Sequence, residues 1–64
     1  MRRWTFNRAL KEARALGFQL WRGTLRRCDG YSARSDDGRL HVVGSTLIEI
    51  VARMREARRR YPQA

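Results

Sequence analysis

Apolar residues recur every three or four positions near the start of the chain, as they do on one face of a helix. Thr5 is suited to begin this helix, because its hydroxyl can accept a hydrogen bond from an early helical N–H that has no carbonyl partner. Gly17 can adopt the left-handed conformation that ends many helices. The pattern therefore predicts a helix over about residues 5–16, with an apolar face formed by Phe6, Ala9, Leu10, Ala13 and Leu16.

An alternating pattern follows, which is typical of β-strands. It predicts three strands, over about residues 18–27, 31–36 and 39–43. Gly23 is expected to mark a bulge or bend in the first strand, because glycine weakens a regular strand interior. Two Asp-Gly pairs separate the strands, and a two-residue loop of this composition favours the tight turn that matches strand twist. The pattern therefore predicts an antiparallel meander with turns at Asp29-Gly30 and Asp37-Gly38.

Two-residue turns would also determine which residues of neighbouring strands pair. The first turn predicts Cys28 opposite Tyr31 and Arg26 opposite Ala33. The second turn predicts Arg34 opposite His41, Ala33 opposite Val42 and Ser32 opposite Val43. One face, which we expect to pack under the helices, then holds Tyr31, Ala33, Leu40 and Val42. The opposite, solvated face carries Ser32, Arg34, His41 and Val43, with Trp21 beside them.

A second helical pattern closes the chain. Thr46 and Glu49 have the spacing of a capping box, in which each side chain can bond the other residue's backbone N–H. An apolar stripe follows, formed by Leu47, Ile50, Val51, Met54, Ala57 and Tyr61. Pro62 prevents continuation, so the predicted helix covers about residues 46–61. We predict a single α+β domain, residues 1–64, in the order α-β-β-β-α, with a three-stranded antiparallel meander and two helices packed on one face.

This element order resembles that of double-stranded-RNA-binding domains and of the small HicA-type toxins. The helix-Gly-aromatic-strand opening, Leu16-Gly17-Phe18-Gln19-Leu20, carries the resemblance further. The functional motifs of neither family are present. HicA-type toxins need a histidine near the end of the first strand, where this chain has residues 26–29, Arg-Arg-Cys-Asp. The last helix of RNA-binding domains begins with basic residues, where this chain has residues 46–49, Thr-Leu-Ile-Glu. The resemblance thus implies a fold and no activity.

The net charge of the chain indicates which kinds of partner to expect. The net charge is +9, which attracts polyanions such as nucleic acid or an acidic protein surface. Fourteen of the fifteen basic residues are arginines, so GC-rich coding is an alternative source of the charge. The lone Cys28 cannot form an internal disulfide and suits a reducing cytoplasm. No apolar run approaches the roughly 18 residues that a membrane span needs. We expect a cytoplasmic protein of bacterial or phage origin that does not bind membranes.

The solvated face supplies the first candidate binding residues. Bases can stack on the ring of Trp21 at about 1–3 kcal/mol each, while nearby cations hold phosphates. The cations expected there are Arg34, Arg39 and His41. Further phosphate contacts are expected from two basic clusters, Arg26 with Arg27 and Arg58 with Arg59 and Arg60. Tryptophan and arginine are also enriched at protein interfaces, so a homodimer that buries Trp21 is an alternative.

Residues suited to catalysis are scarce. His41 is the only histidine, and a single cysteine with a single histidine cannot form a structural zinc site within one chain. A pairing of Cys28 with His41 through folding is the one nucleophilic arrangement left open. We therefore predict a small non-catalytic nucleic-acid-binding accessory protein without cofactor. The alternatives are a protein-interaction module or inhibitor that docks on an acidic host-protein surface, and a small toxin or nuclease-like protein.

Overall fold

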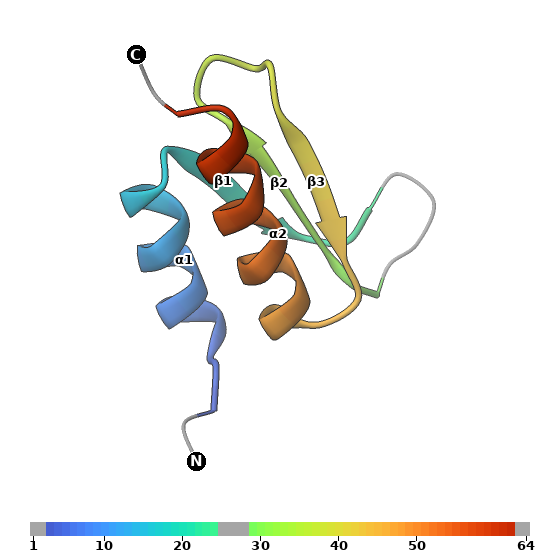
Figure 1. Ribbon diagram of the computed structural model, residues 1–64. Helices are drawn as coiled ribbons and strands as arrows, with labels where there is room; N and C mark the ends of the chain where they lie inside the picture. The colour runs from blue at the N-terminus through green and yellow to red at the C-terminus, as the bar shows by residue number, and fades with distance from the viewer. Residues whose placement is uncertain (1–2, 25–28, 63–64) are drawn as a thin grey trace.

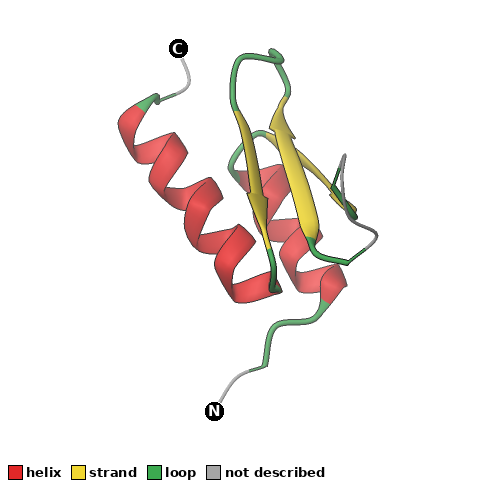
Figure 2. Cartoon of the chain, turned by 90° about the vertical axis from the view of Figure 1, so that its right-hand side faces the viewer, coloured by secondary structure: helices red, strands yellow, loops and turns green. Residues whose placement is uncertain are grey.

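The computed structural model of the chain describes residues 3–24 and 29–62. Its elements are, in order, α1 (Phe6–Ala15), β1 (Phe18–Arg22), β2 (Tyr31–Ser35), β3 (His41–Gly44) and α2 (Leu47–Arg60). The strands form one antiparallel sheet with β2 in the middle. Both helices cover the same face of this sheet (Figures 1 and 2). The predicted α+β fold and its element order are confirmed.

Both helices begin at the predicted threonine caps. The Thr5 hydroxyl accepts from the backbone N–H of Arg8 at 3.2 Å. The Thr46 hydroxyl accepts from the backbone N–H of Glu49 at 3.1 Å. The Glu49 carboxylate bonds the N–H of Ser45 at 3.3 Å, one residue before the partner that a capping box predicts. Gly17, with φ of +77°, follows α1 as its sequence position predicts.

The register of β1 on β2 differs from the prediction. Ala33 lies opposite Leu20, not Arg26, and Tyr31 lies opposite Arg22, not Cys28. β1 ends at Arg22 because Gly23 has a φ of +90°, a left-handed conformation that leaves the strand. The N–H of Gly23 bonds the carbonyl of Gly30 at 2.8 Å. The connection between β1 and β2 therefore runs from Gly23 to Gly30. Predicted strand residues 25–27, and Cys28, lie outside the described residues.

The second hairpin has the predicted register, but not the predicted two-residue turn at Asp37-Gly38. The N–H of Gly38 bonds the carbonyl of Ser35 at 2.9 Å, so Asp36 and Asp37 are the central residues of the turn. Arg34 lies opposite His41, Ala33 opposite Val42, and Ser32 opposite Val43. The buried Ser35 organises its turn: the Ser35 hydroxyl donates to the Asp37 carboxylate at 2.6 Å and accepts from the N–H of Leu40 at 2.9 Å. The hydroxyl of Ser35, together with the N–H of Arg39, holds the pKa of Asp37 below its usual value. Because a side chain takes the N–H of Leu40, regular pairing in β3 begins at His41 instead of residue 39.

The hydrophobic core lies between the helices and the inner face of the sheet. α1 packs on β1, and α2 packs on β2 and β3. The buried apolar side chains are Ala9, Ala13, Phe18, Leu20, Ala33, Ile50, Val51 and Met54. Tyr31, Leu40 and Val42 pack against this core from the same face, as predicted. Outside the core, the Arg55 guanidinium joins the two helices by an ion pair with Glu12 at 2.9 Å.

Replacing Gly44 with alanine is expected to destabilise the fold by about 1–3 kcal/mol, because it overpacks the junction of β3 and α2. A Cβ atom at Gly44 would lie 2.9 Å from the nitrogen and 3.1 Å from the Cα atom of Ile50. Both are backbone atoms in the first turns of α2, so the helix itself would have to shift. Thermal unfolding followed by circular dichroism measures the effect. Val43→Ala, at an exposed neighbouring position, is the control, and equal midpoints for the two variants would contradict the prediction.

Candidate nucleic-acid interface

The sheet face that turns away from the helices carries the candidate interface. Strand pairing sets Trp21, Ser32 and Val43 side by side in one row across the three strands. A second row holds Gln19, Arg34 and His41. We call these six residues the outer face. The structure thus places Trp21, Arg34 and His41 on one surface, as the sequence predicts.

Trp21 and His41 form a stacked pair across β2. Their ring centroids lie 6.1 Å apart, with an angle of 11° between the ring planes. Ser32 lies beside Trp21 on β2 and is 2 % exposed, so it is buried where the sequence predicted a solvated residue. The Ser32 hydroxyl donates to the carbonyl of Gly23 at 2.6 Å, which ties the end of β1 to the centre of the sheet. Trp21 remains 40 % exposed, so part of its surface is accessible to a ligand.

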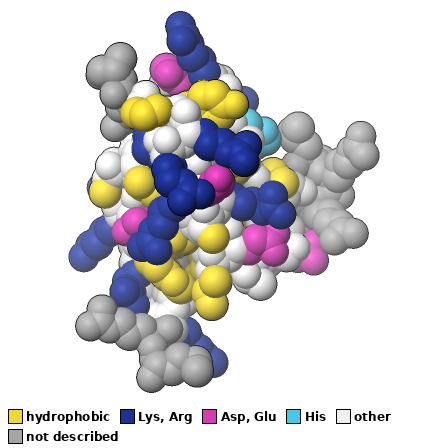
Figure 3. All heavy atoms as spheres, viewed as in Figure 1, with side chains coloured by type: hydrophobic (Ala, Val, Ile, Leu, Met, Phe, Trp, Pro, Cys, Tyr) yellow, Lys and Arg dark blue, Asp and Glu magenta, His cyan; other side chains and the backbone are white. Residues whose placement is uncertain are grey.

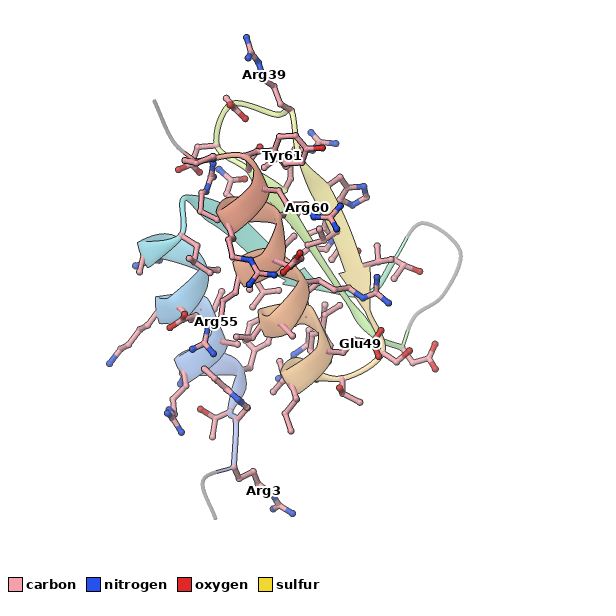
Figure 4. The ribbon with its side chains drawn as sticks, viewed as in Figure 1. Arg3, Arg39, Glu49, Arg55, Arg60 and Tyr61 are labelled. Atoms are coloured by element: carbon pink, nitrogen blue, oxygen red, sulfur yellow. The ribbon has the colours of Figure 1, made fainter. Side chains whose placement is uncertain are left out.

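Two arginines have no carboxylate partner among the described residues: Arg34, which lies beside His41, and Arg39, which lies in the adjoining turn. Arg34 is exposed and lies directly opposite His41 on β3 and Gln19 on β1. Arg39 lies in the turn between β2 and β3, and its side chain projects away from the body of the molecule (Figure 4). Neither guanidinium forms an ion pair within the described part of the chain. Both charges are available to an anion.

The glutamates are engaged on the helical side. Glu12 pairs with Arg55 at 2.9 Å, and Glu49 pairs with Arg53 at 3.4 Å. Glu56 pairs with two arginines of the last turn, Arg59 and, at 3.1 Å, Arg60. Figure 3 shows this side of the molecule, where basic and acidic side chains lie close together. The outer face, by contrast, includes no acidic residue.

Arg58 has an intramolecular role that its position in the Arg58–Arg60 run does not reveal. Its Nε donates to the carbonyl of Leu16 at 2.7 Å, and its Nη2 to the carbonyl of Gly17 at 3.4 Å. Its Nη1 donates to the carbonyl of Tyr61 at 3.1 Å. The guanidinium also lies over the Phe18 ring, 5.1 Å from the centroid. Arg58 therefore caps the end of α1, and it does not share an open cationic surface with Arg59 and Arg60.

Two other groups of predicted site residues are not brought to the outer face. Arg59 and Arg60 lie at the end of α2 and share Glu56. Arg26 and Arg27 lie outside the described residues, as does Cys28, so the pairing of Cys28 with His41 is not described either. The stacking of Trp21 on His41 is the feature that the sequence did not predict. Only the correct register of β1 would have placed these rings diagonally across β2, in neighbouring rows of the outer face.

The fold and the site define a small basic α+β domain with an open aromatic and cationic sheet face. Comparisons with protein-family models, with curated proteins and with solved structures found no match to this chain. Within the described residues, no three side chains of the metal-binding types come together. Neither helix of the described part is both long and apolar enough to cross a membrane.

Proposed function

We propose that this protein binds single-stranded nucleic acid on its outer face and that it acts without catalysis. The observation that carries the proposal is the exposed Trp21–His41 ring pair next to an arginine that has no carboxylate partner among the described residues, Arg34. A base that stacks on an accessible aromatic ring contributes about 1–3 kcal/mol. The lack of acidic residues on this face removes the repulsion that a phosphate would otherwise meet.

A single strand fits this surface better than a duplex does. In a duplex the faces of the bases are covered by their neighbours, so a flat ring on a sheet cannot reach them. Unpaired bases can stack on the Trp21 ring, while Arg34 on the outer face and Arg39 in the adjoining turn hold phosphates. Such contacts tolerate any base, because every base has a π face. We therefore expect affinity with weak sequence preference.

Fluorescence anisotropy with labelled oligo-dT and oligo-U strands tests the proposal. Two to three phosphate contacts predict a slope of log affinity against log salt of about −1.4 to −2.1 on a single strand. Affinity should then fall roughly 7- to 20-fold between 50 and 200 mM salt. Weaker competition by a duplex of matched length is also expected. Affinity that is absent at low salt, or that does not change with salt, would overturn the proposal.

Two arginine variants distinguish a phosphate contact from general charge. Arg34→Gln should reduce the magnitude of the salt slope by about 0.7, the value for one phosphate contact on a single strand. Arg53→Gln removes the same charge from the helical side, where Arg53 pairs with Glu49. This second variant should leave the slope nearly unchanged. Equal effects of the two substitutions would show that net charge, and not the outer face, determines binding.

A further inference from the structure

β1 is an edge strand, and no strand within residues 3–24 and 29–62 pairs with its outward backbone groups. The sheet order is β1-β2-β3, so only one side of β1 meets another strand. The Gly23 N–H bonds the Gly30 carbonyl, and the Asp36 N–H bonds the Gly17 carbonyl, at the two ends of the β1–β2 pairing. Hydrogen-bonded and non-bonded pairs alternate in an antiparallel ladder. The backbone N–H and C=O groups that face away from β2 are therefore those of Phe18, Leu20 and Arg22.

A groove runs beside this edge. It has a volume of about 540 Å³ and is lined by Leu10, Arg14, Phe18, Gln19, Leu20 and Asp36. The first two residues belong to α1, which packs on β1. The groove thus combines a helix wall, a row of strand backbone groups and partly apolar side chains. These are the features of a site where an extended peptide adds a strand to a sheet.

Cations stand at both ends of this edge. Arg14 lines the groove near Phe18, at the start of β1. At the other end of the strand, the Arg22 guanidinium lies over the Phe6 ring, 4.7 Å from the centroid. Asp36 is the one acidic residue among those that line the groove, and it lies at the Arg14 end. Together with the net charge of +9, this arrangement favours a partner that carries carboxylates.

We propose that the free edge of β1 binds an extended acidic segment of a partner protein as a fourth strand of the sheet. Main-chain hydrogen bonds to Phe18, Leu20 and Arg22 supply the pairing. Alternate side chains of the added strand face the groove, where an apolar one contacts Leu10 and acidic ones approach Arg14 or Arg22. This site shares Gln19 with the outer face. It does not include the Trp21 and His41 rings, which lie on the opposite side of the sheet from α1.

A second copy of this chain fits the edge poorly. Two chains that joined through their β1 strands would each bring a charge of +9. They would also bring two α1 helices to the same side of the joined sheet at the seam, because α1 packs on β1. A peptide strand that brings negative charge and no helix of its own avoids both conflicts.

The test uses a labelled ten-residue peptide whose alternate positions carry glutamate, valine and glutamate on one face and threonine on the other. An otherwise identical peptide with lysine in place of glutamate is the control. Anisotropy measures affinity, and amide hydrogen exchange measures protection of the protein. The glutamate peptide should bind more tightly, and it should slow exchange at Leu20 and Arg22 by at least about tenfold. Equal affinity for the two peptides, or binding without this protection, would overturn the proposal.

Arg22→Pro and Arg22→Ala form a matched pair for the backbone contact. Both remove the guanidinium, but only proline also removes the outward N–H. This N–H does not point to β2, so proline breaks no bond of the ladder, and edge positions of this kind tolerate proline. With thermal unfolding confirming that both variants fold, Arg22→Pro should bind the glutamate peptide about tenfold more weakly than Arg22→Ala. Equal affinities would show that no strand is added at this position.

A substitution at Asp36 tests the end of the groove where Arg14 lies. Asp36→Asn removes the acidic residue beside Arg14, so it should strengthen binding of the glutamate peptide. An unchanged or weaker affinity would contradict the placement of the peptide along the groove. Oligonucleotide binding provides an independent comparison: Trp21→Ala should weaken it and leave peptide affinity nearly unchanged. Failure of the peptide experiment therefore does not affect the proposed function, and loss of oligonucleotide binding does not affect the edge site.

Discussion

Replacing Trp21 with alanine is expected to weaken binding of single-stranded oligonucleotides roughly 5- to 150-fold, which corresponds to the loss of one stacked base. The ring is 40 % exposed and lies parallel to His41, so its removal eliminates the flat surface that a base would cover. Duplex binding relies on phosphate contacts alone and should change much less. Fluorescence anisotropy with both kinds of oligonucleotide, at one low salt concentration, measures the difference.

Two further substitutions on the same face isolate the contribution of the ring. Trp21→Phe keeps an aromatic surface and should retain most of the affinity. Val43→Ala removes an apolar side chain that is 43 % exposed in the same row as Trp21, but it removes no ring. Its effect on binding should be small. If Trp21→Ala and Val43→Ala behave alike, or if Trp21→Ala weakens duplex binding equally, then no base stacks on Trp21.

Arg58→Ala is expected to destabilise the fold by about 2–4 kcal/mol, since hydrogen bonds from charged groups contribute about 1.5–3 kcal/mol each and the part-buried bond to the Leu16 carbonyl would be lost. The side chain bonds the carbonyls of Leu16 and Gly17 at the end of α1 and covers the buried Phe18 ring. In a domain of this size, each kcal/mol lowers the unfolding temperature by roughly 4–8 °C. Thermal unfolding monitored by circular dichroism gives the shift.

The next residue in the chain provides the control for this prediction. Arg59 is 77 % exposed and contacts only Glu56 among the described residues, so Arg59→Ala should cost less than about 1 kcal/mol. Arg58→Lys should lie between the two alanine variants. Lysine keeps the charge but lacks the planar fork that reaches several carbonyls at once. Similar unfolding temperatures for Arg58→Ala and Arg59→Ala would exclude the capping role of Arg58.

Arg58 bonds the end of α1, whereas Arg59 pairs with Glu56 on the surface. This difference decides which residues of the Arg58–Arg60 run should be replaced in binding experiments. Loss of oligonucleotide binding in an Arg58 variant would report unfolding as much as loss of a phosphate contact. Arg59 and Arg60 can be replaced without this complication, because their ion pairs with Glu56 are exposed. Binding experiments should therefore use Arg34 and Trp21 on the outer face, and stability experiments should use Arg58.

Local chemistry was sufficient to predict the elements of this protein from its sequence. Thr5 and Thr46 cap their helices, and the spacing of the apolar residues that follow each threonine identified the faces that pack on the sheet. Tyr61 is the exception, because it lies beyond the end of α2 and is 59 % exposed. The second hairpin also had the predicted register, because its turn is built from adjacent residues around Asp37 and Gly38. In each case the interacting groups lie within a few positions along the chain, so their spacing contains the necessary information.

Contacts between residues far apart in the sequence determined the features that the sequence did not predict. The register of β1 depends on the backbone conformation at Gly23 and on the packing of Leu20 beside Ala33, neither of which an Asp-Gly pair encodes. That register alone brings Trp21 onto His41. The sequence by itself determined the element order, the caps and the charge. Only the tertiary structure assigned Arg58 to the fold, left the edge of β1 open and assembled the outer face, because these depend on which segments meet after the chain has folded.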